Sequence, residues 1–191
     1  MDYIVRKARE SDKLDIAKTI ADSFEKSFRI VARDTDRVAG ILENGIAADR
    51  FYVAERDGKI IGIAAYADCT GRAMNPTKDD CQKHFGRARG LIIFKLFCFN
   101  LLRPLTYPAT TGYIDIVGVV KEARGKGVAK ELLREIIRNN SQYNEFVLDT
   151  DSINASAIKS YTDFGFVEIE RVPIVKFVKR SKVVMKYIVQ A

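Results

Sequence analysis

A short basic loop with two glycines, Arg124 to Ala129 (RGKGVA), is the part of the sequence best suited to binding an anion. It follows an apolar segment and opens an amphipathic one, so it should lie where a helix starts. Backbone N–H groups there lack intrahelical partners, and the helix macrodipole favours negative charge. Gly125 and Gly127 let the backbone approach a ligand closely, while Arg124 and Lys126 add positive charge. The loop predicts a site for a phosphate-bearing ligand.

Two other nucleotide-binding loops fit this stretch less well. The P-loop pattern GxxxxGK[ST] is absent. The dinucleotide pattern GxGxxG is closer, but Lys130 occupies the place of its third glycine, which close packing of helix on strand requires. Asp149 does lie near the distance expected of a ribose-binding acid, so a dinucleotide stays as an alternative.

The residues before the loop predict a strand followed by helices and a hairpin. Apolar spacing and turn residues give, in order, a strand over 3–8, helices over 13–28 and 35–42, and strands over 51–55 and 59–67. Asp57-Gly58 between the last two segments is a strong hairpin signal. These two strands should therefore pair antiparallel.

The residues around and after the loop predict a βαβ unit and two closing strands. The pattern gives a strand over 113–120, a helix over 127–139, a strand over 145–149, a helix over 153–164, and strands over 166–171 and 183–189. Gly165 should stop the last helix. We expect one α/β (α+β) domain over residues 1–191, with a helical insertion at about 68–111 before the central strand.

The insertion predicts one helix over 78–102, ended by Pro104. Its apolar residues from Leu91 to Leu102 surround nearly the whole helix, and a helix that is apolar on all sides should be buried on all sides. A lid over an acceptor cleft is the first interpretation, and a homodimer interface is the second. A membrane-surface helix is the third, because basic residues flank the run at Lys83, Arg87, Arg89 and Arg103.

Composition narrows the partners of this chain. Its 191 residues carry a formal charge of +7, which suits an anionic ligand, and no RNA- or DNA-binding motif is visible, so no nucleic acid is expected. The apolar run is too short for an integral membrane segment. The chain has one histidine and no cluster at metal-ligand spacing, so we expect no metal. Cys69, Cys81 and Cys98 follow no secretory leader and predict reduced thiols in the cytoplasm.

Two motifs resemble those of the GNAT N-acetyltransferase superfamily. Residues 119–132 (VVKEARGKGVAKEL) are similar to its motif A, [QR]-x-x-G-x-[GA], which Arg124, Gly127 and Ala129 match. Residues 154–166, with Asn154, Ala157, Tyr161, Gly165 and Phe166 at the usual spacing, resemble motif B. The resemblance implies a mixed, mostly antiparallel sheet of about six or seven strands flanked by helices, with acetyl-coenzyme A as cosubstrate.

The same resemblance implies which residues hold the cofactor. These are Val117, Gly118, Val119, Arg124, Gly125, Lys126, Gly127, Val128, Ala129, Lys130 and Asn154. In similar enzymes the central strand splays from its neighbour, and its last residues bond the pantetheine and the acetyl carbonyl. We expect a bulge at Gly118 and a Val119 N–H that stabilises the negative charge developing on that carbonyl oxygen.

Catalysis in such enzymes needs an acid and a base. Tyr161 matches the usual acid, and its alternative is an aromatic packing residue. Asp115 is the best candidate base, and its alternative is a structural hydrogen bond, since a carboxylate in an apolar strand needs a partner or a function. His84 is a second titratable candidate, although its neighbours are typical of a solvated basic face.

The resemblance implies transfer of an acetyl group to an amine of a small molecule or of a protein or peptide, by direct attack. A noncatalytic acyl-coenzyme A sensor that uses the same loop is the alternative. Related folds accept antibiotics, polyamines, amino acids and protein termini, so these residues do not name the acceptor.

Overall fold

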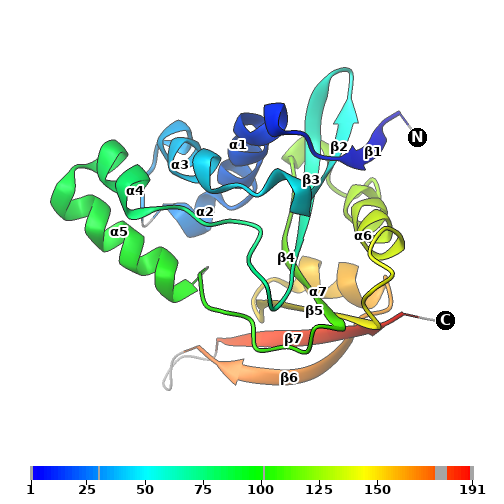
Figure 1. Ribbon diagram of the computed structural model, residues 1–191. Helices are drawn as coiled ribbons and strands as arrows, with labels where there is room; N and C mark the ends of the chain where they lie inside the picture. Colours follow the sequence, from blue (N-terminus) through cyan, green and yellow to red (C-terminus); the bar gives the residue numbers. More distant parts are fainter. Residues whose placement is uncertain (1, 30, 101, 175–179, 190–191) are drawn as a thin grey trace.

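A seven-stranded mixed sheet runs through the chain in the computed structural model, which describes residues 2–29, 31–100, 102–174 and 180–189 (Figure 1). The strand order is β1-β2-β3-β4-β5-β7-β6, and β4 and β5 are parallel while the other neighbours are antiparallel. The strands are β1 (Ile4–Lys7), β2 (Phe51–Arg56), β3 (Lys59–Ala67), β4 (Thr111–Val119), β5 (Glu145–Asp151), β6 (Val167–Pro173) and β7 (Ser181–Ile188). The predicted mixed, mostly antiparallel sheet is confirmed.

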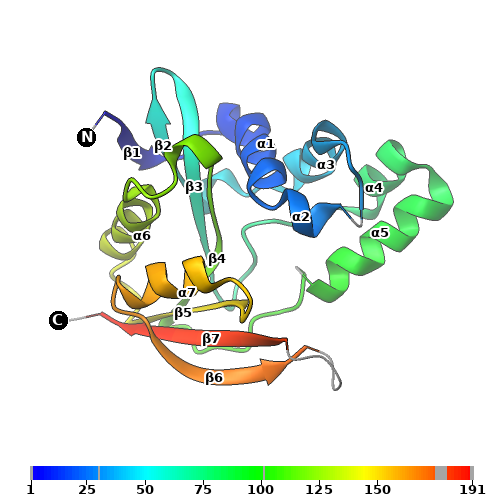
Figure 2. The same cartoon turned by 180° about the vertical axis from the view of Figure 1, so that it is seen from behind.

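Helices cover both faces of this sheet (Figures 1 and 2). They are α1 (Lys13–Ser23), α2 (Glu25–Phe28), α3 (Thr35–Leu42), α4 (Lys78–Phe85), α5 (Arg87–Asn100), α6 (Val128–Arg138) and α7 (Ala155–Thr162). The predicted hairpin of β2 and β3 and the helix that follows the glycine loop are both confirmed.

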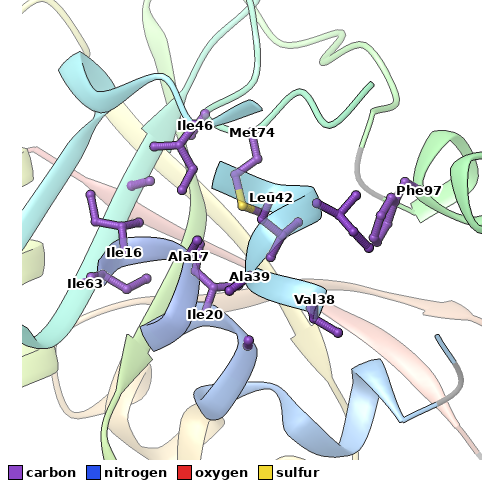
Figure 3. Packing of buried hydrophobic residues seen from close by; sticks show 14 of the residues in the cluster. Ile16, Ala17, Ile20, Val38, Ala39, Leu42, Ile46, Ile63, Met74 and Phe97 are labelled. Carbon is purple, nitrogen blue, oxygen red and sulfur yellow. The ribbon is translucent and has the colours of Figure 1, made fainter. Parts of the chain in front are cut away.

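Two apolar clusters form because β2 and β3 send alternate side chains to opposite faces. Phe51, Val53 and Ile63 belong to the first cluster, which includes buried residues of α1 and α3. Figure 3 shows Ile63 with residues of both helices in this cluster. Tyr52 and Ala54 belong to the second cluster, which includes buried residues of α6. The near-continuous apolar run of these strands therefore reflects a sheet that is buried on both sides.

The first predicted helix, over 13–28, is divided in the structure. Phe24 leaves the helical region, with φ −113° and ψ 22°, so α1 ends at Ser23 and α2 starts at Glu25. Both Phe24 and Phe28 pack against the first cluster. The change of direction at Phe24 thus keeps apolar side chains of both helices on the core.

The prediction of one helix over 78–102 is wrong in two respects. Gly86 adopts φ 78°, a conformation that ends α4, and α5 starts at the next residue. The expectation of burial on all sides also fails, because the Ile92 side chain is 62% exposed while Ile93 is 3% exposed. The insertion is a helical hairpin with one outward face, and residue 101 of the predicted helix lies outside the described residues.

Two glycines bring helices close to the β3–β4 pair from opposite faces. A Cβ atom at Gly62 would lie 2.7 Å from Val128 Cγ1 at the start of α6. A Cβ atom at Gly118 would lie 3.0 Å from Ser23 Oγ and 3.1 Å from Ser23 Cβ at the end of α1. Any larger residue at position 118 would therefore be in tight contact with the end of α1.

The bulge that we expected at Gly118 lies elsewhere. Gly118 pairs regularly with Ile63, whereas the register shifts where Tyr66 pairs with Ile114 and Ala65 with Ile116. Asp115 is the extra residue on β4. The bulge was predicted at the wrong residue because a glycine in a strand can allow either close packing or a bulge, and the sequence alone does not distinguish the two.

Asp68, directly after β3, joins three segments of the chain. Thr70 Oγ1 donates to Asp68 Oδ1 at 2.6 Å, Tyr143 OH donates to Asp68 Oδ2 at 2.7 Å, and Arg50 Nη1 lies 3.2 Å from Asp68 Oδ1. Burial acts to raise the pKa of this carboxyl, but the hydrogen bonds and the Arg50 charge outweigh burial and lower the pKa to about 2.

Replacing Asp68 should therefore destabilise the fold in a pH-dependent way. A depressed folded-state pKa contributes stability above the unfolded value, near 3.9, and that contribution is lost as pH falls toward 2. We expect Asp68→Asn to lower the free energy of unfolding by about 1–2 kcal/mol at pH 7. Urea titrations from pH 7 to pH 3 should show the two proteins converging below about pH 4.

The matched control is Asp57→Asn, at an exposed turn position with φ 51° that asparagine tolerates, and it should leave stability nearly unchanged. A deficit for Asp68→Asn that is as large at pH 3 as at pH 7 would contradict the role of the carboxylate charge.

The close contact at Gly118 gives a second prediction. Gly118→Ala should force α1 away from β4 and lower the free energy of unfolding by about 1–3 kcal/mol. Adding Ser23→Gly should recover part of that loss, because the contacting side chain is removed. Among the described residues, Ser23 Oγ is buried without a hydrogen-bond partner, so Ser23→Gly alone should cost little beyond glycine's chain entropy. Thermal unfolding of the three variants tests this, and a double variant no more stable than Gly118→Ala would refute it.

Candidate active site

β4 and β5 diverge in the middle of the sheet (Figure 1), and we call the unpaired stretch between their backbones the opening. The two strands pair only over Thr111–Tyr113 and Glu145–Val147, whereas β4 continues to Val119 alongside β3 and β5 continues to Asp151 alongside β7. The end of β4 therefore has one edge that faces this opening rather than β5. The predicted splay of the central strand is present.

The backbone at the end of β4 has a defined direction. Val120 N donates to Ile61 O on β3 at 3.0 Å. Because the N–H and C=O groups of successive strand residues point to opposite edges, those of Val119 and Val117 point away from β3, toward the opening. Arg124 Nε donates to Val119 O at 3.0 Å, as this direction requires. The backbone of Gly118 faces β3.

The glycine loop lies beside the same end of β4. Gly125 and Gly127 adopt φ 74° and 81°, the left-handed region, and nothing lies within 4 Å of where a Cβ atom would be on either residue. Gly127 is the N-cap of α6 and contributes no side-chain hydrogen bond to the helix start. Residues 124–127 are exposed. The helix start is thus accessible to a ligand, and its backbone conformation depends on glycine.

The Asp115 carboxylate is buried and paired. Its side chain is 4% exposed, Arg72 Nη2 donates to Oδ1 at 2.5 Å, and Ala73 N donates to Oδ2 at 2.9 Å. Burial raises the pKa of Asp115, and the Arg72 charge opposes that shift. The Arg72 guanidinium also lies over the Tyr113 ring, 5.1 Å from its centroid. The bulge thus turns a carboxylate toward the segment that follows β3.

A second carboxylate, Asp149, lies on β5 across the opening. Tyr113 OH donates to its Oδ1, Lys182 Nζ is 3.0 Å from its Oδ2, and its side chain is 25% exposed. The sequence pointed to Asp149 only as a ribose-binding acid. Ligand sites gather at the carboxyl ends of parallel strands, and a charged residue that ends the apolar run of β5 was the signal that could have identified it.

Tyr161 belongs to the same region. It is half-buried on α7, and its ring meets Phe166 edge-on with centroids 6.0 Å apart. Burial and, as the smaller cause, the negative charge of Asp149 together raise the pKa of Tyr161 to about 12. The phenol therefore keeps its proton at neutral pH.

The remaining candidates have structural partners. Asn154 caps α7, and its Oδ1 accepts from Ala157 N at 3.2 Å. His84 is half-buried, and its ring lies directly against Gly40 of α3 rather than on a solvated face. Within the described ranges, no group of three His, Cys, Asp or Glu residues could hold a metal ion. No helix in the described part of the chain is long and apolar enough to cross a membrane.

A curated relative and several solved structures are similar to this chain. N-alpha-acetyltransferase 30 of Schizosaccharomyces pombe is 35% identical over 63 residues, which are 31% of this chain and 41% of that protein. The match therefore spans less than half of the length of that relative.

Among solved structures, the ribosomal-protein-alanine N-acetyltransferase of Brucella melitensis has a TM-score of 0.62 and 22% identity, covering 97% of this chain and 99% of its own. YncA of Salmonella typhimurium, solved with its cofactor acetyl-CoA, has a TM-score of 0.62 and 19% identity, covering 98% and 94%. These similarities establish the fold.

The family model described as "Acetyltransferase (GNAT) family" matches residues 7–166, which include the whole sheet from β2 to β5, the glycine loop and α7. Both motifs and the splayed strands lie within that match. On this evidence the chain belongs to the GNAT acetyltransferase family.

Proposed function

We propose that this chain is an acetyl-coenzyme A-dependent N-acetyltransferase that acetylates an amine of a small molecule or of a protein or peptide by direct attack. The observation that carries the proposal is an accessible, glycine-bounded helix start beside an open strand edge, in a chain of this family. The helix start suits a pyrophosphate. The open strand edge suits an extended pantetheine chain, which needs backbone hydrogen-bond partners.

The residues at these two places fit acetyl-coenzyme A. We assign the pyrophosphate to backbone N–H groups from Gly125 to Lys130, with Arg124 and Lys126 as neighbouring cations, because no side chain blocks the approach at either glycine of the loop. We assign the pantetheine to the unpaired edge of β4 over Val117–Val119, and we propose that Asn154 contacts the other side of the pantetheine. When bound, this cosubstrate supplies the thioester whose acetyl group is transferred.

The Val119 N–H is our candidate donor to the thioester carbonyl oxygen. As the amine nitrogen bonds to the carbonyl carbon, negative charge develops on that oxygen, and a fixed donor stabilises it. The carbon–sulfur bond then breaks, the sulfur leaves with the bonding electrons, and the nitrogen loses a proton. Tyr161 is our candidate donor to the departing sulfur, since its phenol holds its proton at neutral pH.

Two carboxylates are candidates to accept the amine proton. Both oxygens of Asp115 are engaged by Arg72 and Ala73, in a side chain that is 4% exposed. The side chain of Asp149 is 25% exposed and lies close enough to Tyr161 for its charge to influence that phenol. We propose Asp149 as the base or as the group that orients the base water, and we retain Asp115 as the alternative with a structural role as its competing explanation.

The terminal α-amine of a protein or peptide is the acceptor class that we favour. The similar protein from Schizosaccharomyces pombe is named an N-alpha-acetyltransferase, and the Brucella melitensis neighbour is named for a ribosomal-protein alanine. An α-amine has a pKa of about 8, against about 10.4 for lysine, so it is more readily deprotonated at neutral pH. A cytoplasmic setting is part of the proposal, supported by the free thiols of Cys69, Cys81 and Cys98.

Turnover separates this proposal from a noncatalytic acyl-coenzyme A sensor. We expect thiol release from acetyl-coenzyme A with peptides that have a free N-terminus, and mass spectrometry should place the acetyl group on the acceptor amine. Tyr161→Phe should lower kcat by about 10²-fold because the sulfur loses its donor, while coenzyme A still raises the melting temperature. The phenylalanine keeps the ring contact with Phe166, so the fold should be retained.

Heat stabilisation by coenzyme A, together with no thiol release on peptides, amino acids, polyamines or aminoglycosides, would favour the sensor. Stabilisation by NAD but not by coenzyme A would revive the dinucleotide alternative.

Paired substitutions separate the two carboxylates. Asp149→Asn should lower kcat/KM by about 10²-fold or more with a modest change in stability. Asp115→Asn should mainly destabilise, by about 3–5 kcal/mol, because it leaves the buried Arg72 charge without its partner. Steady-state kinetics and urea unfolding on both variants measure this. A large loss of kcat in a stably folded Asp115→Asn protein, with Asp149→Asn fully active, would assign the base to Asp115.

A further inference from the structure

The outer face of the insertion hairpin combines exposed aliphatic side chains with positive charge. Leu91, Ile92 and Leu96 on α5 are 36%, 62% and 39% exposed. The hairpin also exposes cations at Lys83, Arg87 and Lys95. We call these six residues the α5 outer surface. The α4–α5 hairpin lies on the opposite side of the molecule from α6 in both views (Figures 1 and 2).

The opposite side of α5 anchors the helix and leaves the outer surface without a role in the core. Ile93 and Phe97 are 3% and 4% exposed, and Phe97 meets Phe28 edge-on with centroids 6.4 Å apart. A Cβ atom at Gly90 would lie 2.5 Å from Gln82 Cα, so α5 is packed tightly on α4. The outer surface therefore lies on a tightly packed helical hairpin.

The hairpin is one of two basic stretches of the chain, the other being residues 171–191, with six Lys or Arg residues and no Asp or Glu. Residues 78–103 contain six Lys or Arg residues and two Asp residues, a net +4 out of the +7 of the whole chain. Both acids, Asp79 and Asp80, lie in the first turn of α4, and no Asp or Glu occurs from residue 81 to residue 103. An acid-free basic surface around exposed aliphatic side chains is complementary to an anionic, apolar partner.

A second copy of this chain matches such a surface poorly. In a two-fold interface the same patch faces itself, so Lys83, Arg87 and Lys95 would oppose one another. An anionic bilayer is complementary to both the aliphatic and the basic side chains. The aliphatic side chains enter the headgroup boundary, while Lys and Arg contact the acidic headgroups. Lys95, between the aliphatic positions, can extend its stem along them and keep its ammonium group in the headgroups.

We propose that the α5 outer surface docks this protein on anionic lipid bilayers, with α5 lying in the plane of the interface. This docking is independent of the proposed acetyl transfer. No helix among the described residues could span a membrane, so the helix lies on the bilayer. Four of the six residues come from two consecutive turns of one helix, as interfacial binding requires.

Cosedimentation of the full chain with vesicles tests the proposal. At 0.15 M salt, we expect binding to vesicles of phosphatidylcholine and phosphatidylserine at 3:1, and little binding to phosphatidylcholine alone. The charge variant Lys83→Glu, Arg87→Glu and Lys95→Glu should weaken binding on the order of a hundredfold, and Leu91→Ser with Ile92→Ser on the order of tenfold.

Matched variants separate the surface from the overall charge. Lys7→Glu, Lys18→Glu and Lys59→Glu change three exposed lysines elsewhere and also reduce the net charge from +7 to +1. Ile4→Ser with Ile188→Ser removes aliphatic side chains that are 60% and 59% exposed on other strands. Both control variants should keep most of the vesicle binding, and thermal unfolding should show that all four variants remain folded.

Four outcomes would overturn the proposal. One is equal loss of binding in the two charge variants, which would mean attraction by net charge alone. Another is no binding of the unmodified chain to the anionic vesicles. The third is a dimer in light scattering that Leu91→Ser with Ile92→Ser dissociates, which would assign the surface to a second copy. Binding of poly-glutamate but not of vesicles would likewise replace the bilayer by an acidic polypeptide.

Discussion

The divergence of β4 from β5 is the constraint on which the rest of the structure depends. A strand that pairs with both neighbours along its whole length offers no backbone group to a ligand, because its N–H and C=O groups are used within the sheet. Here β4 pairs with β5 over three residues and with β3 up to Val119. Polar groups of Val117 and Val119 consequently face the opening, where an extended ligand can act as the missing strand.

Such an opening in the middle of a sheet needs support from outside it. Gly62 and Gly118 lie on neighbouring strands and admit α6 and α1 to the two faces at nearly the same level, since Gly62 pairs with Val119 and Gly118 with Ile63. The helices thus hold β3 and β4 from both sides at the place where support from β5 ends. The start of α6, which bears the glycine loop, is fixed to the strand end by the same packing.

Local patterns were sufficient to predict the strands, the hairpin and the glycine loop, because each depends on residues close together in the sequence, but they missed the breaks at Phe24 and Gly86. The bulge at Asp115 and the true reason for Gly118 were not predictable in that way. Asp115 is 43 residues from Arg72, and Ser23 is far from Gly118 in the sequence, so neither contact leaves a local pattern. The prediction that α5 is buried on all sides failed for a related reason, because the burial of a helix depends on which elements pack against it.

The sequence singled out Asp149, but for a different role from the one that we propose for it. Its spacing from the glycine loop suited a ribose-binding acid, yet that spacing follows from any βα unit in which a helix leads into the next strand. The placement of Tyr113, Lys182 and Tyr161 around it, which no local pattern contains, is what supports the proposed role as a base.

The distribution of charge extends this reasoning from the site to the whole molecule. A pyrophosphate needs a few cations near one helix start, and Arg124 and Lys126 supply them. A net +4 on residues 78–103, at the opposite end of the molecule from α6, is therefore not accounted for by the cofactor. Electrostatic attraction is screened over about 8 Å at physiological salt, so an anion at the glycine loop would interact little with the cations of residues 78–103. The positive net charge of this chain thus has more than one local source, and the share carried by residues 78–103 does not belong to the candidate active site.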